Sequence, residues 1–449
     1  MNDTIAAIST ALGGSALAMV RLSGTDAISV VQRIFKGRPL ATLPTSTAAY
    51  GHVVSGTTTI DEVVITVFRA PKSFTTEDLV EITCHGGAFV TRKILSLLLE
   101  NGARLALPGE FTKRAYLNGR IDLTQAEAVM DIIASETDAA LKMANNALSG
   151  QTKQYINSLR DRLLQCILEI EVNIDYPEYE DEKQITSNIL LPNLLSLKQE
   201  LEEILRKADI GKLIQNGIKT AIIGKPNVGK SSLLNALLKE DRAIVTDIAG
   251  TTRDTIEAGL KLGGVVLKLI DTAGIRETQE RVEQIGILRA KKVIEEADLV
   301  ILVFDYSAPL DQNDAQILDL TAHKKRIIVV NKQDLAVQID LSQIPNHLLV
   351  SSFKARDIER LEKAIQDVCL ENIETDIDYT YLGSMRQIEK VKEAKRHLED
   401  AIASLEEQMP IDIANIDIRS SYDCLSMIVG EATSEALHEE LFKRFCLGK

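Results

Sequence analysis

The first 118 residues alternate short apolar runs with Gly and Pro, a pattern typical of short strands joined by turns. Residues 16–22, 63–68 and 79–83 have the composition of strands. Residues 88–100 follow the period of an amphipathic helix, and Asn101-Gly102 after them is a C-cap signal. We therefore expect residues 1–118 to form an α+β domain.

From residue 119 the pattern becomes helical. Thr124 and Glu127 fit a capping box before a long helical run that reaches about residue 209, with a break near Tyr176-Pro177. A second helical stretch begins at about residue 385. Because neither stretch alone carries enough residues to bury its apolar faces, we expect 119–216 and 373–449 to be two parts of one helical domain. Independent segments remain the alternative.

Residues 217–372 alternate apolar, β-branched runs with helical segments. The candidate strands are residues 220–223, 265–270, 299–304, 326–330 and 348–350. Strands separated by helices predict a parallel, doubly wound sheet. The expected fold class is therefore multidomain α/β, with this doubly wound α/β domain inserted into the helical one.

Composition and charge exclude several classes of protein. The chain has 449 residues and a formal net charge of −14, so it has no whole-chain basic footprint for nucleic acid. Trp is absent and aromatic residues make up 4%, which disfavours a base-stacking sheet. Five cysteines without a CxxC pair favour a reducing compartment. With no basic N-terminal region and no apolar run long enough to span a bilayer, we expect a cytoplasmic protein without membrane contact.

A phosphate-binding loop is the strongest chemical signal. An apolar strand is followed by the octapeptide Gly224-Lys225-Pro226-Asn227-Val228-Gly229-Lys230-Ser231, which matches G-x-x-x-x-G-K-S, and then by a helix. The glycines let backbone N–H groups close around phosphate oxygens at a helix N-terminus. We expect Lys230 to reach the β- and γ-phosphates and Ser231 to bind Mg²⁺.

Two further segments point to guanine. Asn331-Lys332-Gln333-Asp334 follows a candidate strand, and Asp334 can accept hydrogen bonds from N1–H and the exocyclic amine of guanine. Adenine would leave this carboxylate unpaired, which disfavours an ATPase. Ser351-Ser352-Phe353 follows the last strand and resembles the S-A-K loop of GTPases, with Phe353 in place of Lys.

The segment Asp271-Thr272-Ala273-Gly274 has the D-x-x-G pattern, in which the carboxylate supports the magnesium shell and the last N–H contacts the γ-phosphate. In chain order the four elements are the phosphate-binding loop 224–231, the D-x-x-G segment 271–274, the segment 331–334 and the segment 351–353. Together, in this order, they identify a Ras-like GTPase. The residues expected to bind GTP are Asn227, Val228, Gly229, Lys230, Ser231, Ser232, Thr246, Asp247, Ile248, Ala249, Gly250, Thr251, Thr252, Asp271, Thr272, Ala273, Gly274, Asn331, Lys332, Asp334, Ser351, Ser352 and Phe353.

Several segments resemble one family of bacterial GTPases. The loop 246–254 resembles switch I of the Era/Der/MnmE group, where Thr252 would be the second Mg²⁺ ligand. The flanks resemble signatures of the MnmE (TrmE) tRNA-modification GTPases along essentially the whole chain. These signatures are Pro71-Lys72-Ser73-Phe74-Thr75-Thr76-Glu77-Asp78, Cys84-His85-Gly86-Gly87, Leu107-Pro108-Gly109-Glu110-Phe111-Thr112-Lys113-Arg114-Ala115, the segment 117–128, and Phe445-Cys446-Leu447-Gly448-Lys449.

The resemblance implies an N-terminal folate-binding domain through which two chains dimerise. It implies a heterotetramer with the flavoprotein MnmG. Together they would add a carboxymethylaminomethyl or aminomethyl group at C5 of the wobble uridine in certain tRNAs. The one-carbon donor would be a tetrahydrofolate derivative, 5-formyl- or 5,10-methylene-tetrahydrofolate.

The resemblance also assigns residues. Arg21, Glu81, Arg120 and Lys449 would contact folate, with the arginines suited to its anionic tail and Glu81 to its pterin ring. Cys446 is a candidate functional thiol. Potassium would bind Asn227 and the backbone of Thr246, Ile248 and Thr251 and replace an arginine finger. Because Ile275 has no polar group to orient water, the catalytic role would pass to Glu283.

Two other functions stay open. One is an Era/Der-like switch in ribosome assembly, which the H-G-G and L-P-G-E-F-T signatures disfavour. The other is a folate enzyme with a regulatory G domain. Single cations such as Arg21 are most often surface residues, and a carboxylate inside a strand such as Glu81 is often part of an ion pair.

Overall fold

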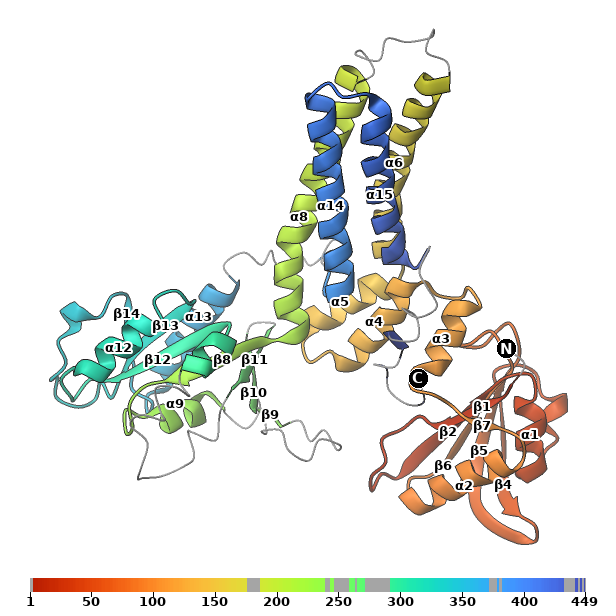
Figure 1. Ribbon diagram of the computed structural model, residues 1–449. Helices are drawn as coiled ribbons and strands as arrows, with labels where there is room; N and C mark the ends of the chain where they lie inside the picture. The colour runs from red at the N-terminus through yellow and green to blue at the C-terminus, as the bar shows by residue number, and fades with distance from the viewer. Residues whose placement is uncertain are drawn as a thin grey trace. The chain divides into compact units, whose positions relative to one another are not determined.

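The computed structural model describes residues 3–175, 186–238, 243–245, 258–262, 265–270, 291–370, 378, 382–431, 441–442, 445 and 448. Contacts group the chain into two compact units (Figure 1). Unit 1 comprises residues 1–130, 147–195 and 393–449, and unit 2 comprises residues 131–146 and 196–392. The unit boundaries fall inside helices α4 (Leu123–Ala134), α5 (Asp138–Leu148), α8 (Leu191–Asn216) and α14 (Met385–Glu406). The sequence-derived domain boundaries stay a prediction.

Unit 1 begins with a sheet in the order β3-β4-β5-β6-β2-β1-β7. Its strands are β1 (Ile5–Ile8), β2 (Leu17–Ser23), β3 (Phe35–Gly37), β4 (Thr47–Ser55), β5 (Thr58–Phe68), β6 (Leu79–His85) and β7 (Arg104–Leu105). Neighbouring strands are antiparallel except for the parallel pair β1 and β7. The three strands expected from the sequence are confirmed within β2, β5 and β6, and so is the helix α2 (Ala88–Glu100) with Asn101 as its C-cap.

The two faces of this sheet carry different side chains, because successive strand residues point to opposite sides. Val20, Ile65 and Ile82 belong to a core shared with α1 (Ala27–Ile34) and α2. On the other face, Arg21 of β2 lies opposite Glu81 of β6 in the register of the sheet. The sheet therefore brings together two charged groups that are 60 residues apart in the chain.

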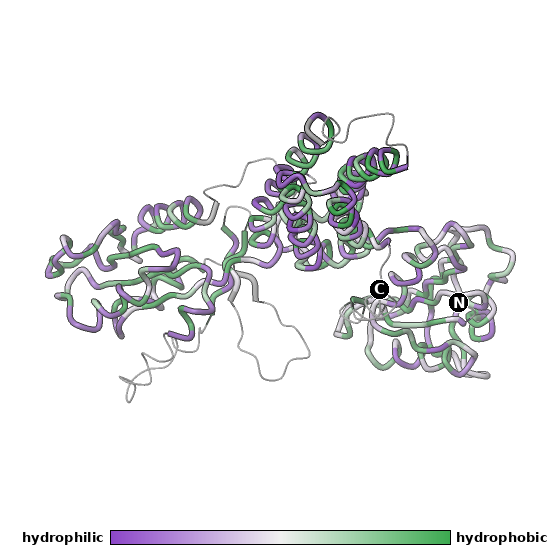
Figure 2. Tube along the Cα trace, turned by 45° about the horizontal axis from the view of Figure 1, so that its top comes forward, coloured by the Kyte–Doolittle hydropathy of each residue, from purple (hydrophilic) through white to green (hydrophobic). Residues whose placement is uncertain are grey.

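The described remainder of unit 1 is mainly helical. Hydrophobic and hydrophilic residues alternate along the long helices (Figure 2), as amphipathic packing requires. α6 (Gln151–Asp175) packs along α15 (Ile411–Val429). There Arg160 lies over the ring of Tyr422, 5.0 Å from its centroid, and it also pairs with Glu431. The helix expected to end near residue 209 continues as α8 to Asn216.

The cap of α4 differs from the sequence-based expectation. Thr124 does not precede the helix but lies inside it, since α4 begins at Leu123. The capping group is Asp122, whose Oδ1 accepts hydrogen bonds from the N–H groups of Thr124 at 2.8 Å and Gln125 at 3.0 Å. Aspartate is a strong N-cap residue because its carboxylate satisfies N–H groups that have no partner within the helix.

Replacing Asp122 with alanine is therefore expected to destabilise the first turn of α4 by about 1 kcal/mol. The amides of Thr124 and Gln125 should then exchange with solvent deuterium about fivefold faster. Hydrogen exchange read by mass spectrometry or NMR checks this result. Asp122→Asn keeps an oxygen acceptor and should stay near the wild-type rate, whereas unchanged exchange in Asp122→Ala would contradict the capping role.

Unit 2 contains the second sheet, in the order β14-β13-β12-β8-β11-β10-β9. The strands are β8 (Ile218–Ile223), β9 (Ala243–Val245), β10 (Ala258–Leu262), β11 (Val265–Leu269), β12 (Leu299–Asp305), β13 (Arg326–Asn331) and β14 (His347–Leu349). From β14 to β11 all neighbours pair in parallel. Apolar clusters lie on both faces, one including α9 (Lys230–Leu237) and α13 (Ala355–Leu370), the other contacting α12 (Gln312–Leu320). The predicted doubly wound fold is confirmed.

Two strands of this sheet, β9 and β10, were not predicted from the sequence. β10 pairs antiparallel with both β9 and β11, so the sheet has an antiparallel edge. The sequence carried a signal for part of it, because Gly263-Gly264 stands between β10 and β11, and Gly-Gly is typical of a two-residue hairpin loop. Within the described residues no helix is both long and apolar enough to cross a membrane.

Candidate functional site

The phosphate loop lies between β8 and α9, where the sequence places it. A side chain on Gly224 would begin 2.3 Å from the carbonyl oxygen of Val303, and one on Gly229 would begin 2.2 Å from Nδ2 of Asn331. Gly229 also has φ of 94°, which favours glycine. Close approach of two neighbouring strand ends therefore requires glycine at both positions.

Lys230 is held inside this loop. Its Nζ donates hydrogen bonds to the carbonyl oxygens of Gly224 at 2.7 Å and Lys225 at 2.6 Å. Burial lowers the pKa of the Lys230 ammonium, because the charged form loses hydration. Anionic phosphate oxygens at the N-terminus of α9 would restore favourable charge there. Ser231 and Ser232 follow in the first turn of this helix and are exposed.

Asn331 connects the phosphate loop with the base-reading loop. It is fully buried at the end of β13, and its Nδ2 donates to the carbonyl oxygen of Val228 at 3.1 Å. Its Oδ1 accepts from the backbone N–H of Ser352 at 3.2 Å. One amide side chain thus fixes the spacing between the segments assigned to phosphate and to guanine.

Asp334 has the position and charge expected of a guanine reader. Its Oδ1 accepts a hydrogen bond from the hydroxyl of Ser351 at 2.6 Å. This hydrogen bond holds the pKa of the Asp334 carboxyl below its usual value, so the group is anionic. The residue is exposed, and its other oxygen is available to donors on a base.

The neighbours of Asp334 play different parts. Lys332 has φ of 65°, and its Nζ pairs with Asp305 at 2.5 Å. Its stem therefore runs across the carboxyl end of β12. Phe353 is 84% exposed, so its ring is not part of the core. Its role in GTP binding stays a prediction.

Many of the predicted site residues lie outside the described residues. These are Thr246, Asp247, Ile248, Ala249, Gly250, Thr251, Thr252, Asp271, Thr272, Ala273, Gly274, Glu283, Cys446 and Lys449. For Mg²⁺, the described ligand candidate is Ser231, whose hydroxyl follows Lys230 directly. For K⁺ it is Asn227, which is exposed and has φ of 65°. An oxygen from each side chain suits the hard cation assigned to it.

A second candidate site lies on the N-terminal sheet, on the face opposite α1 and α2. Arg21 donates to Oε1 of Glu81 through Nε at 3.0 Å and Nη2 at 2.7 Å. The carbon at the centre of the Arg21 guanidinium lies 5.9 Å from the ring centroid of Phe74, and that of Arg120 lies 5.0 Å from it. Two of the predicted folate contacts, Arg21 and Arg120, therefore lie near one aromatic ring that sequence reasoning did not single out, and the third, Glu81, is bonded to Arg21.

This geometry changes the expected division of labour. Because Arg21 and Glu81 are bonded to each other, the predicted folate contacts of these two residues would fall on the same end of the ligand. Arg120 is exposed and donates only one described hydrogen bond, to the carbonyl oxygen of Phe74 at 3.2 Å. Arg120 is therefore the better match for an anionic tail.

The C-terminal segment contacts the same domain. Ser9 donates a hydrogen bond to the carbonyl oxygen of Gly448 at 3.1 Å. Phe445 and Phe442 pack around Gly109, where a side chain would begin 2.5 Å from the carbonyl oxygen of Phe442. Residues near both ends of the chain thus meet on the N-terminal domain, within unit 1.

Known proteins resemble the chain over nearly its whole length. Residues 4–120 match the family described as GTP-binding protein TrmE N-terminus, and residues 123–446 match MnmE helical domain. The tRNA modification GTPase MnmE of Lactobacillus gasseri is 49% identical over 454 residues, 100% of this chain and 98% of that protein. The MnmE of Streptococcus thermophilus is 49% identical with the same coverage. The crystallised G domain of the T. maritima FeoB iron transporter is 27% identical and covers 34% of this chain and 98% of its own, with a TM-score of 0.26.

Proposed function

Because this chain belongs to the MnmE (TrmE) family and is a GTPase of tRNA modification, we propose that it drives wobble-uridine modification by potassium-stimulated GTP hydrolysis. With the flavoprotein MnmG it adds a carboxymethylaminomethyl or aminomethyl group to C5 of that uridine in certain tRNAs. A tetrahydrofolate derivative is the one-carbon donor. The observation that carries this proposal is a GTP site and a charged aromatic site in one chain.

The GTP half of the proposal rests on the phosphate loop and the base loop. Lys230 neutralises the β- and γ-phosphates, and Asp334 selects guanine. Mg²⁺, held by Ser231 and Thr252, supplies Lewis-acid charge to the phosphates when bound. Because Asn331 bonds to both loops, binding of the base and binding of the phosphates stabilise the same arrangement. Glu283 orients the attacking water.

The folate half rests on the cluster around Phe74. Glu81 accepts hydrogen bonds from the amine donors of a pterin, and its pairing with Arg21 keeps the carboxylate oriented. Arg120 binds the anionic glutamate tail, and Lys449 and Cys446 extend the same site. The contact between Ser9 and Gly448 supports this extension, since it brings the end of the described chain to the sheet.

Dimerisation through the N-terminal domain is supported by the uncovered part of its sheet. Tyr50 of β4 and Val64 of β5 are in register on the face that carries Glu81, and they are 63% and 41% exposed. Leu17 of β2 is 60% exposed. Apolar side chains grouped on an exposed sheet mark an interaction surface. A second copy of the chain covers this surface in our proposal.

Mass spectrometry of wobble nucleosides tests the proposed function. Deleting the gene should remove the C5 group from the affected uridines, and the wild-type gene should restore it. Lys230→Ala should not restore it, because the phosphates lose their main cation. Unchanged uridine modification after deletion would contradict the proposal. If the deletion changes the ribosomal subunit profile and leaves uridine modification unchanged, the alternative of an Era/Der-like assembly switch is favoured.

A further inference from the structure

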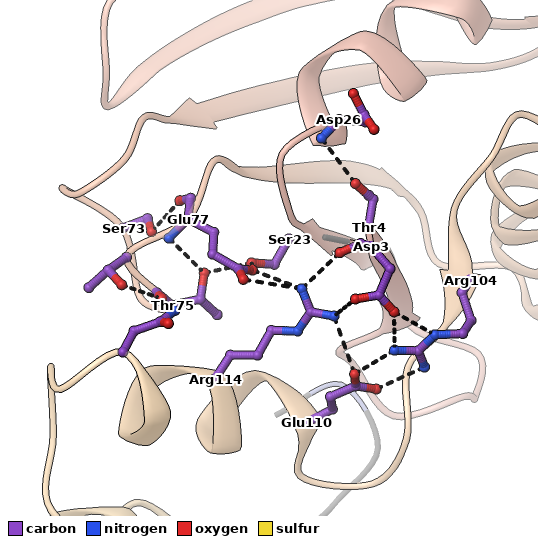
Figure 3. Close-up of polar contacts among 12 residues, drawn as sticks. Asp3, Thr4, Ser23, Asp26, Ser73, Thr75, Glu77, Arg104, Glu110 and Arg114 are labelled. Carbon is purple, nitrogen blue, oxygen red and sulfur yellow. Dashed lines mark hydrogen bonds and ion pairs between the residues drawn. The ribbon is translucent and has the colours of Figure 1, made fainter. Parts of the chain in front are cut away.

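A buried arginine joins three parts of the N-terminal domain (Figure 3). Arg114, on α3 (Glu110–Leu117), is 1% exposed. Its Nη1 donates to Oε2 of Glu77 at 3.0 Å and to the carbonyl oxygen of Asp3 at 2.9 Å. Its Nη2 donates to Oδ1 of Asp3 at 2.8 Å and to Oε1 of Glu110 at 3.3 Å. The guanidinium therefore ties the segment 71–78 to the start of β1 and to its own helix.

Two of the carboxylates that pair with Arg114, those of Glu110 and Asp3, have pKa values below their usual range. Burial alone would raise the pKa of Glu110, but hydrogen bonds from Arg104 and the backbone of Leu107, together with the charge of Arg114, hold it below its usual value. The pKa of Asp3 is lowered in the same way against the effect of burial. The pair of Arg114 with Glu110 is buried, and a buried ion pair fixes geometry because each charge needs its partner in place.

From Glu77 the contacts continue along the segment 71–78. The side-chain carboxylate of Glu77 accepts a hydrogen bond from the hydroxyl of Ser23 at 2.7 Å. The backbone carbonyl oxygen of Glu77 accepts one from the hydroxyl of Ser73 at 2.6 Å. The hydroxyls of Ser23 and Thr75 are 2.5 Å apart and share a hydrogen bond. Both sides of Phe74 are therefore anchored to Glu77 or to the strand β2.

Phe74 is the aromatic residue held by this segment. Asn118, directly after α3, donates to the carbonyl oxygen of Thr75 at 2.6 Å. Arg120 donates to the carbonyl oxygen of Phe74 itself. The ring is half-buried and packs against an apolar cluster that includes Phe111, and the guanidinium carbons of Arg21 and Arg120 lie 5.9 and 5.0 Å from its centroid. Its position thus depends on contacts that begin at Arg114.

We propose that Phe74 is a ligand-binding residue that stacks on the flat ring of the one-carbon donor, and that the ion pair of Arg114 with Glu77 positions it. The inference rests on the proposed folate site and deepens it. Flat conjugated rings stack on aromatic faces, and the flanking guanidinium groups add planar cationic surfaces to the same stack. Arg114 and Glu77 are positioning residues, because they act through the segment that carries Phe74.

A double-mutant cycle on the full-length chain tests this inference, with 5-formyltetrahydrofolate as the probe in titration calorimetry. Glu77→Gln keeps the shape and one acceptor of the side chain but removes the charge facing Arg114. Phe74→Leu keeps the apolar bulk but removes the aromatic face. Each single variant should bind the probe about tenfold more weakly. In the Phe74→Leu background, Glu77→Gln should change binding less than about twofold, because its effect passes through the ring.

The matched control is Asp3→Asn. Asp3 is another partner of Arg114, but it lies on the β1 side and not on the segment 71–78. The Asp3→Asn substitution should lower the thermal stability of the chain and leave binding of the probe within about twofold of wild type. If Glu77→Gln does not fold, Ser73→Ala removes a milder contact of the same segment and should still weaken binding.

Two outcomes would overturn the positioning role of the Arg114–Glu77 pair and leave the role of Phe74 in place. One is wild-type affinity of Glu77→Gln for the probe. The other is a double variant whose loss of affinity equals the product of the losses in Glu77→Gln and Phe74→Leu. Multiplying effects would show that Glu77 only stabilises the domain. Absence of binding by a wild-type chain that hydrolyses GTP would contradict the proposed folate site and this inference together. The inference is supported if affinity for the probe falls in both single variants and does not fall further in the double variant.

Discussion

Asp334→Asn is expected to lower the preference for GTP over xanthosine triphosphate by a factor on the order of 10⁴. The carboxylate would accept two hydrogen bonds from guanine, whereas the Asn amide offers one oxygen acceptor for N1–H and an N–H donor in place of the second acceptor. Xanthine carries a carbonyl group where guanine has its exocyclic amine, so the amide pairs with it. Competition of both nucleotides against a fluorescent GDP derivative measures the change.

Ser351→Ala is the graded control for this substitution. It removes the hydroxyl that donates to Asp334 at 2.6 Å but keeps the carboxylate. The pKa of Asp334 should rise toward its ordinary value, and the group should remain ionised at neutral pH. GTP binding should therefore weaken only modestly, with the base preference retained. Full GTP preference in Asp334→Asn would show that another residue reads the base.

The second large effect concerns hydrolysis. Glu283→Ala is expected to lower the turnover number for GTP about 10²-fold or more, because Ile275 has no polar group that could orient the attacking water. Nucleotide affinity should stay nearly unchanged, since in the proposed role this carboxylate would act on water and not on bound GTP. Single-turnover hydrolysis and equilibrium binding, measured on the same preparations, separate the two quantities. Glu280→Ala, three positions earlier, is the matched control and should hydrolyse GTP at the wild-type rate.

Potassium should contribute to the same step. An arginine finger accelerates hydrolysis roughly 10³–10⁵-fold, and a monovalent cation at the proposed site of Asn227 and the switch I backbone would supply part of that charge. Sodium is smaller and fits such a loop poorly. Wild-type turnover should therefore be much higher in KCl than in NaCl at equal ionic strength. Equal rates in both salts would remove the potassium mechanism, and a fully active Glu283→Ala would remove the catalytic role of Glu283.

Local patterns determined much of the fold. The helix α2 and the strands β8, β12 and β13 were readable because period and composition are properties of short segments. The phosphate loop was readable for the same reason, since its eight residues are contiguous. The short strands β7 and β9 were not, because their structure depends on pairing with a neighbour.

Contacts between distant residues were decided only by the tertiary structure. The sequence marked Arg21 and Glu81 as separate candidates, and the register of β2 with β6 made them one ion pair. A buried asparagine joining two loops, Asn331, could not be inferred from its motif, because its partner carbonyl lies 103 residues earlier. Burial decided that Arg114 is an internal anchor, although the sequence alone makes arginine a surface residue. Local propensity acts within a few residues, whereas pairing and burial depend on which strand ends and helices the fold brings together.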